Sequence, residues 1–284
     1  MKTIDLHVHS NFSDGTCTPE ELVDLAVKSG LSAFALTDHD TIDGVSYAIS
    51  YAETLKNKGM DITVIPGVEL SAGYKKRDIH ILGLYLNCQD QKLNSTLSAL
   101  KKEREQRNQK MIQNFQNAGF DITMENLMEE SKDAVITRAH FAKQLVKKNY
   151  VSSSKEAFQK YLGEDGPFYV ARKFITPEGA IDLIKEAGGI PILAHPILYH
   201  LPASELDSLV KRLTDHGLKG IETIYSTYSI EEQNIVSRLA AKYNLVRTGG
   251  SDFHGRNKPD IRLGTGMGNL SIPYSILNEL TAFF

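Results

Sequence analysis

Two imidazoles and a carboxylate lie close together near the start of this 284-residue chain. The stretch TIDLHVHSNFSDG places His7 and His9 two residues apart and Asp14 five residues later. Side chains at i and i+2 point to the same face of a β-strand, and the alternation in TIDLHV predicts a strand. One strand face would then carry two nitrogen ligands, and the next loop an oxygen ligand. This pattern indicates either a metal site or a buried, hydrogen-bonded histidine pair.

More histidines and carboxylates accompany predicted strands along the chain. The candidate metal ligands are His7, His9, Asp14, His39, Glu69, His80, His195, Asp252 and His254. Most lie at or just after the carboxyl end of a strand, whereas His80 lies near the start of the strand DIHILGLYL. All are nitrogen or oxygen ligands, which suit Mn, Fe or Zn rather than a thiolate zinc site. Their number exceeds the needs of one ion, so we expect two or three divalent ions close together, an arrangement that hydrolyses phosphate esters.

The elements that position these residues follow a strand, loop, helix rhythm. The stretch TPEELVDLAVKSG predicts a helix, with Thr18 as its N-cap and Gly30 at its end. Seven short, apolar strands alternating with helices imply a parallel sheet covered on its outer face. The ligands belong to many strand ends, and only a closed barrel brings all those ends to one mouth. We therefore expect an α/β protein with a seven-stranded, TIM-like (β/α)7 barrel rather than an open, doubly wound sheet.

The rhythm is interrupted by a helical insert. Residues 89–168 show no convincing strand pattern, and a long amphipathic helix contributes an apolar stripe of Leu97, Leu100, Met111 and Phe115. We expect a barrel domain of residues 1–88 and 169–284 and an insert, or lid, of residues 89–168. The insert leaves the barrel after the strand that carries His80, so it would lie over the active face.

Cations of the insert are candidates for binding a substrate phosphate, because an arginine can form two hydrogen bonds to one phosphate. The residues that we expect to contact substrate are Arg138, His140, Arg172 and Lys173. The alternative for Arg138 and His140 is a helix start with solvated charges. The run KKEREQRNQK is typical of a solvated helix face, although Arg104 and Arg107 could belong to a phosphate-binding patch.

Composition restricts the partners and the compartment. The net charge of −3 provides no global basic field to hold long nucleic acid. Cys17 and Cys88 have no C-x-x-C spacing, which argues against a disulfide framework and fits a reducing cytosol. No stretch approaches the ~18 apolar residues of a membrane span. We expect a cytoplasmic protein.

Five motifs together carry a family resemblance. The stretches HVHSNFSDG, LTDHDT, PGVE, AHP and GGSDFHG, in that order, resemble the successive motifs of the PHP (polymerase and histidinol phosphatase) family. The resemblance implies a distorted seven-stranded barrel with two or three metal ions at its mouth, held by the nine residues above. Several members have His where this chain has Asp14. A carboxylate is the harder ligand and favours Mn over Zn, so we expect Mn, with Fe or Zn as alternatives.

The resemblance also implies a metal-dependent phosphoesterase, in which water activated by the ions attacks phosphorus in line. The stretch SDGTCTPEEL and the insert are most similar to members that act on nucleotide ends. The expected substrate is a nucleoside 3′,5′-bisphosphate or a short 5′-phosphorylated oligonucleotide. Alternatives are a histidinol-phosphate phosphatase and a non-catalytic, metal-stabilised interaction domain. The complete ligand set argues against the second.

Other polar residues near the motifs have predicted roles. Asp38, His195 and His254 are the predicted catalytic residues, as donors of a proton to the leaving group. Asp38 could instead orient an imidazole, and Asp40 could cap the helix that follows. Glu222 either faces the site inside the barrel or serves the fold.

Overall fold

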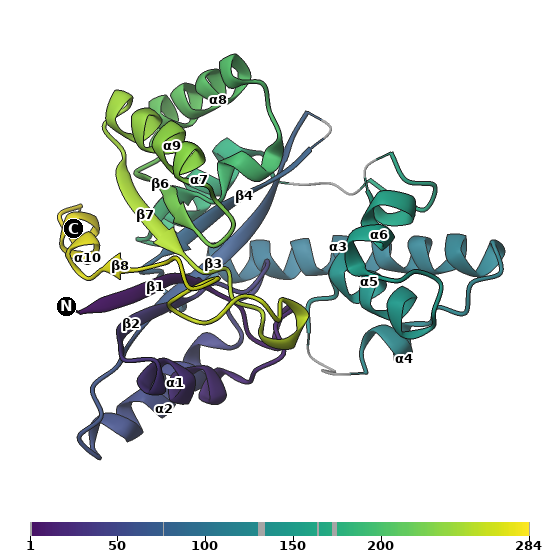
Figure 1. Cartoon of the computed structure of the whole chain (residues 1–284), viewed down its shortest axis with the longest axis horizontal. Helices are drawn as coiled ribbons and strands as arrows, with labels where there is room; N and C mark the ends of the chain where they lie inside the picture. Colours follow the sequence, from purple (N-terminus) through teal and green to yellow (C-terminus); the bar gives the residue numbers. More distant parts are fainter. Residues whose placement is uncertain (1, 76, 130–133, 164, 172–174, 284) are drawn as a thin grey trace.

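The computed structural model describes residues 2–75, 77–129, 134–163, 165–171 and 175–283 (Figure 1). Its strands are β1 (Thr3–Val8), β2 (Leu31–Leu36), β3 (Thr63–Tyr74), β4 (Arg77–Leu84), β5 (Ile190–Leu193), β6 (Gly220–Tyr225), β7 (Val246–Gly250) and β8 (Ile272–Pro273). Its α-helices are α1 (Pro19–Lys28), α2 (Val45–Lys56), α3 (Gln91–Asn117), α4 (Met124–Leu127), α5 (Arg138–Lys147), α6 (Ser154–Ala157), α7 (Pro177–Glu186), α8 (Ala203–His216), α9 (Ile230–Lys242) and α10 (Ser275–Thr281). A π-helical turn (Phe158–Leu162) and two 3-10 turns (Pro196–Tyr199 and Gly255–Asn257) complete the set.

The strands form one sheet in the order β7-β6-β5-β4-β3-β2-β1-β8. The segment after β7 returns to β1 and nearly closes this sheet into a barrel. The Asp252 amide donates to the His7 carbonyl at 2.9 Å, and the His9 amide donates to the Phe253 carbonyl at 3.0 Å. The predicted TIM-like barrel is confirmed, but it has eight strands rather than seven. The additional strand is the two-residue β8, which pairs antiparallel with the start of β1.

The expectation of a wholly parallel sheet is wrong at β4. This strand runs antiparallel to both β3 and β5. Its amino end therefore lies at the barrel mouth, which explains why His80 is near the start of its strand. β3 also continues to Tyr74 rather than ending near Glu69, and it places Ser71 opposite His80.

A close approach of β7 to β1 requires a glycine. A Cβ atom on Gly250 would lie 2.2 Å from the Cβ atom of His7. Any side chain at position 250 would push apart the two strands that close the barrel. Gly250 thus allows the predicted ligands on β1 and those after β7 to meet.

Apolar side chains form three clusters. One packs the outer helices against the sheet, and a second joins the interior of β1, β2, β4 and β5 to α10. The third belongs to the insert, where the rings of Phe115 and Phe168 are 4.1 Å apart between centroids. The stripe predicted for the insert alone is divided, because Leu97 and Leu100 pack with the barrel cluster. The domain boundaries at 88/89 and 168/169 stay a prediction.

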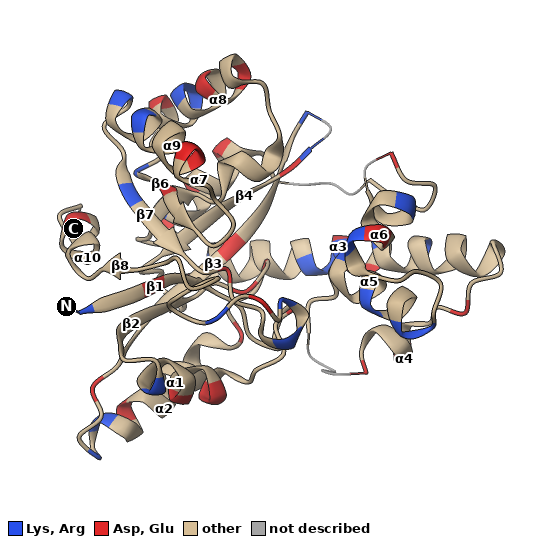
Figure 2. Ribbon diagram, in the orientation of Figure 1, with Lys and Arg blue, Asp and Glu red and all other residues tan. Residues whose placement is uncertain are grey.

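The insert extends from one side of the barrel (Figure 1), and Lys, Arg, Asp and Glu are spread over barrel and insert alike (Figure 2). Within the described ranges, no helix has the length and apolar character needed to cross a membrane.

Candidate metal centre

Glu69 of β3 is the centre of the polar cluster at the barrel mouth and is 1% exposed. Its Oε2 atom faces one group of imidazole nitrogens at 3.1–3.2 Å, from His7, His9 and His39. Its Oε1 atom faces a second group, at 2.7 Å from His80 Nδ1 and 3.0 Å from His195 Nε2. The two oxygens of one carboxylate thus point to two different sets of rings.

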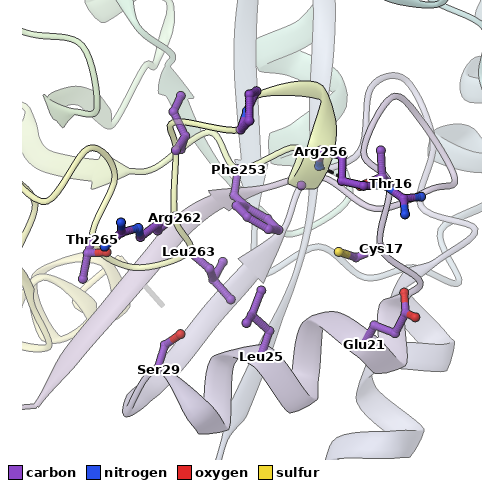
Figure 3. Close-up of a pocket in the computed structure, with 13 residues that line it drawn as sticks. Thr16, Cys17, Glu21, Leu25, Ser29, Phe253, Arg256, Arg262, Leu263 and Thr265 are labelled. Atoms are coloured by element: carbon purple, nitrogen blue, oxygen red, sulfur yellow. Dashed lines mark hydrogen bonds between the residues drawn. The ribbon is translucent and has the colours of Figure 1, made fainter.

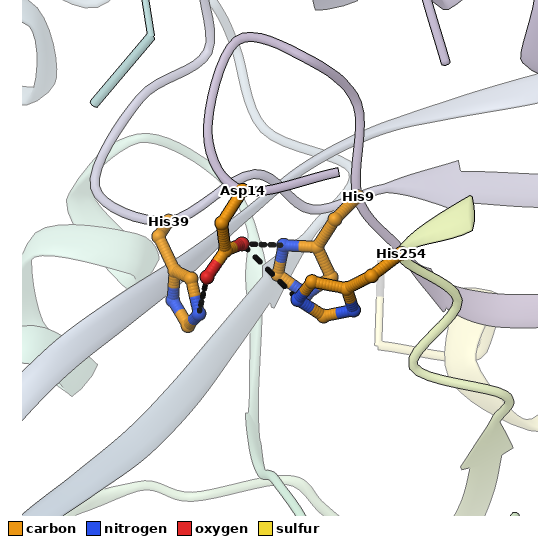
Figure 4. Close-up of side chains that lie close together, drawn as sticks. All are labelled: His9, Asp14, His39 and His254. Carbon is orange, nitrogen blue, oxygen red and sulfur yellow. Dashed lines mark ion pairs between the residues drawn. The ribbon is translucent and has the colours of Figure 1, made fainter. Parts of the chain in front are cut away.

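Asp14, in the loop after β1, is the centre of a neighbouring cluster (Figure 4). Its Oδ1 atom lies 3.1 Å from His254 Nε2 and 3.8 Å from His9 Nδ1. Its Oδ2 atom lies 3.8 Å from His39 Nε2. His9 and His39 therefore stand between the Asp14 cluster and the Glu69 cluster.

Asp252, two residues after β7, completes the set from the closing side of the barrel. Its Oδ1 atom lies 3.3–3.7 Å from ring nitrogens of His7, His9 and His254. Its Oδ2 atom accepts hydrogen bonds from the Tyr225 hydroxyl at 2.5 Å and from Lys258 Nζ at 2.6 Å. The structure thus brings all nine predicted ligands together at one mouth.

The unpaired atoms of this cluster fit cations. His7 Nε2, His9 Nε2, His39 Nδ1 and Asp14 Oδ1 are buried and have no hydrogen-bond partner. These atoms nevertheless lie close to one another and to Glu69, as lone pairs do when they converge on a common ion. Three overlapping groups have ligand atoms within 4.8 Å of one another: His9, Asp14, His39 and His254; His7, His9 and Glu69; His39, Glu69 and His80. The alternative of a buried, hydrogen-bonded histidine pair does not explain why these nitrogen and oxygen atoms lack hydrogen-bond partners.

The electrostatics of the cluster also favour bound cations. Burial alone would raise the pKa of Glu69 and of Asp14, but the facing imidazoles hold both values well below the usual range. Burial lowers the pKa of His39 to about 3, despite the nearby carboxylates. Burial opposes protonation of His9, yet Asp252 and Glu69 raise its pKa to about 9. The ionised, buried carboxylates are therefore stabilised by nearby positive charge, which protons or metal ions can supply.

Residues behind the ligands fix the orientation of their rings. Glu222 of β6 lies 3.2 Å from His7 Nδ1 and accepts from the His195 amide at 2.8 Å. His254 Nδ1 bonds to its neighbour Asp252 through the backbone carbonyl at 2.9 Å. Such bonds leave the other ring nitrogen free for a metal. Glu222, whose role the sequence left open, thus faces the site.

Asp38 also acts behind the ligands. Its carboxylate accepts hydrogen bonds from the Ser10 amide, the Ser10 hydroxyl and the Ser13 hydroxyl at 2.5–2.8 Å. The Ser13 oxygen in turn lies 3.4 Å from His9 Nδ1. This geometry corresponds to the predicted orienting role, through a serine, and Asp38 is 2% exposed.

Asp5 is a buried carboxylate for which the sequence assigned no role. It accepts from the Ser251 amide at 2.8 Å and from the Ser251 hydroxyl at 2.5 Å, which ties β1 to the segment after β7. The sequence feature that could have indicated a buried role for Asp5 is its position within the apolar strand pattern of TIDLHV. The pairing register of β1 shifts between Asp5 and Val8.

The predicted cap at Asp40 is wrong. The α2 helix begins after Gly44 without a side-chain cap, while Asp40 accepts from the Ser71 amide at 2.9 Å and pairs with Arg104 of α3. The expectation of a solvated face is also wrong at Arg104 and Arg107, which are 6% and 5% exposed. The long helix places Arg104 against the barrel, where it pairs with Asp40.

Of the predicted substrate contacts, Arg138 and His140 lie at the start of α5. The N-cap residue Thr137 donates its hydroxyl hydrogen to Asp14 Oδ2 at 2.9 Å, and His140 Nδ1 accepts from the Thr137 amide at 3.0 Å. Arg138 donates to the Leu162 carbonyl at 3.2 Å and lies 3.8 Å from Asp78. Arg172 and Lys173 lie outside the described residues.

An α/β barrel whose mouth gathers nitrogen and oxygen ligands in this way is the framework of a metal-dependent phosphohydrolase. The PHP domain matches residues 5–216, and the chain belongs to this family.

Named relatives span nearly the whole chain. The 5'-3' exoribonuclease Rnm of Escherichia coli (strain K12) is 35% identical over 260 residues, which are 92% of this chain and 87% of the relative. A 3',5'-nucleoside bisphosphate phosphatase of Chromobacterium violaceum is 31% identical over 255 residues, covering 89% of this chain and 88% of the relative. A structure described as an amidohydrolase from Chromobacterium violaceum, with bound sulfate and no metal, aligns with a TM-score of 0.88 and 30% identity over 99% of this chain and 96% of that chain.

Proposed function

We propose that this phosphohydrolase cleaves phosphate esters of nucleotides, either a nucleoside 3′,5′-bisphosphate or a short 5′-phosphorylated oligonucleotide. The observation that carries the proposal is the convergence of nine predicted ligands at one mouth, seven of which form three overlapping groups. The names of the relatives support the substrate class, since they include an exoribonuclease and a nucleoside bisphosphate phosphatase.

The site would hold two or three divalent ions, held by His7, His9, Asp14, His39, Glu69, His80, His195, Asp252 and His254. The sharing of His9, His39 and Glu69 between groups supports more than one ion. When bound, such ions polarise phosphoryl oxygens and lower the pKa of water. The carboxylate of Asp14 supports Mn, with Fe or Zn as alternatives.

Proton delivery to the leaving oxygen belongs to Asp38, His195 or His254. Asp38 is committed to three hydrogen bonds with Ser10 and Ser13, and both nitrogens of His254 face carboxylate or carbonyl oxygens. His195 is the most exposed of the three at 7%, so we assign the proton to it, and in that role it would not be a metal ligand. Replacement of His195 by Asn would then slow release of an alkoxide more than release of an aryl oxide, a better leaving group.

The insert would bind the part of the substrate that lies away from the metals. Arg138 follows Thr137, whose hydroxyl contacts Asp14, so its backbone lies next to the Asp14 cluster, while its guanidinium lies 3.8 Å from Asp78, two residues before His80. We assign to Arg138 the second phosphate of the substrate, with His140, Arg172 and Lys173 as further contacts. Residues 89–168 would act as a lid over the mouth.

A competition assay tests the substrate class. Nucleoside 3′,5′-bisphosphate, short 5′-phosphorylated RNA, histidinol phosphate and an aryl phosphate are mixed in one tube with Mn²⁺ and protein. Faster consumption of the nucleotides supports the proposal, and consumption of histidinol phosphate first contradicts it. Metal uptake without hydrolysis of any substrate would indicate a metal-stabilised interaction domain.

The free thiols of Cys17 and Cys88 support a cytoplasmic location.

A further inference from the structure

A groove with a volume of about 700 Å³ lies between α1 and the segment after β7 (Figure 3). Its middle is apolar, because Leu25, Phe253 and Leu263 line it. Arg256 and Arg262 line opposite ends, and both are exposed (Figure 3). The volume is within the range of pockets that hold small ligands, about 300–1,000 Å³.

The groove begins beside the metal centre. Thr16 on its edge follows Asp14 by two residues, and Phe253 stands between the ligands Asp252 and His254. The Arg256 amide donates to the Thr16 hydroxyl at 2.9 Å, so two residues that line the groove join the loop after Asp14 to the segment after His254. The groove is therefore built from the same two segments that carry these predicted ligands.

The charges of the groove favour an anionic ligand. Arg256 and Arg262 form no ion pair with any described residue. Glu21 also lines the groove, but its carboxylate accepts from the Thr18 amide at 2.8 Å in the cap of α1. Two guanidinium groups thus flank an apolar surface, and the acidic residue that lines the groove, Glu21, is engaged in the helix cap.

We propose that this groove binds the 3′ portion of a short RNA whose 5′ end occupies the metal centre. Arginines contact backbone phosphates, and apolar surfaces receive the flat faces of bases. The inference rests on the proposed function and narrows its substrate to an oligonucleotide. A nucleoside bisphosphate would not need the groove, because the proposed function assigns its two phosphates to the metal centre and the insert.

The experiment compares substrate lengths in the double variant Arg256→Glu/Arg262→Glu. The measured quantity is kcat/KM for a 5′-phosphorylated pentaribonucleotide divided by kcat/KM for a nucleoside 3′,5′-bisphosphate. We expect this ratio to fall about tenfold relative to the unmodified protein, as two exposed charge pairs are lost. The slope of log kcat/KM for the pentaribonucleotide against log salt concentration should also become shallower by about 1.4, since each single-strand phosphate contact contributes about 0.7.

A matched control carries the same charge change elsewhere. Arg238→Glu/Arg247→Glu alters exposed arginines of α9 and β7, which do not line the groove. The control should keep the ratio and the slope of the unmodified protein. An unchanged ratio in the groove variant, or an equal fall in both variants, would overturn the inference. Hydrolysis of neither substrate by the unmodified protein would instead refute the proposed function itself.

Discussion

The barrel mouth and the helical insert use their polar residues differently. At the mouth, buried imidazoles and carboxylates face one another with ring nitrogens that make no hydrogen bond. In the insert, several polar side chains bond to groups near the mouth: Thr137 to Asp14, Arg138 to Leu162 and Asp78, and Arg104 to Asp40. The polar groups of the mouth are therefore arranged to bind ions, whereas those of the insert form hydrogen bonds and ion pairs that stabilise the mouth.

The insert contacts fall on barrel segments that carry predicted ligands. The contacts, barrel residue first, are Phe12 with Val135, Asp14 with Thr137, Asp40 with Arg104, Asp78 with Arg138 and Asn257 with Lys143. Each barrel residue is a predicted ligand or lies within three residues of one. This distribution suggests that the insert stabilises the geometry of the metal centre in addition to any contact with substrate.

The largest expected effect is the loss of a metal ligand at the barrel mouth, which should abolish metal binding and hydrolysis without affecting the insert. Replacement of His9 by Ala removes a ligand shared by two of the three groups, so the protein should lose bound metal and all measurable hydrolysis while it stays folded. Elemental analysis, phosphate release and circular dichroism measure the three properties. His200→Ala, at an exposed residue, is the control. Retention of metal and activity in chelator would contradict the whole assignment of the mouth.

The next effect concerns the stability of the insert. Phe115 is fully buried in the aromatic cluster of α3 and α5, and Phe115→Ala should reduce the free energy of unfolding by about 3–5 kcal/mol. Urea unfolding followed by circular dichroism measures the change. If the barrel keeps its metals when the insert is weakened, the ion-binding geometry is a property of the barrel alone. Simultaneous loss of metal would show that the two regions depend on each other.

Arg138→Ala tests whether the insert also binds substrate. We expect kcat/KM for a nucleoside bisphosphate to fall ~10- to 100-fold, because a charge-assisted contact to the second phosphate is lost. Hydrolysis of a small aryl phosphate should change little. Steady-state kinetics with both substrates provide the comparison. An equal loss on both would assign Arg138 to the structural contacts with Leu162 and Asp78 instead.

The smallest expected effect concerns the hydrogen bond from the insert to Asp14. Thr137→Val removes the hydroxyl but keeps the shape, and should weaken Mn²⁺ binding about tenfold. Thr137→Ser keeps the hydroxyl and should restore most of the affinity. Titration calorimetry of metal-free protein measures both. Equal affinities for the Val and Ser variants would mean that Asp14 is positioned by the barrel without help from the insert.

The sequence alone predicted which residues gather at the barrel mouth, and it indicated the type of fold. Alternation in β1 placed His7 and His9 together, and their ring centroids are 5.1 Å apart. The strand and helix rhythm indicated a barrel, and a barrel required the strand ends to meet. Both inferences rest on local patterns of side-chain direction and helix capping, which a few neighbouring residues decide.

Only the tertiary structure decided the direction of β4 and the partners of the buried charges. A strand reads the same in either direction, so the antiparallel course of β4 and the place of His80 followed from its pairing with β3 and β5. Glu222 is 215 residues from His7 in the chain, and Thr137 is 123 residues from Asp14. Which polar group satisfies another at such separations depends on how the closed barrel and the packed insert bring them together. No local pattern contains that information, because it arises from the burial of the whole core.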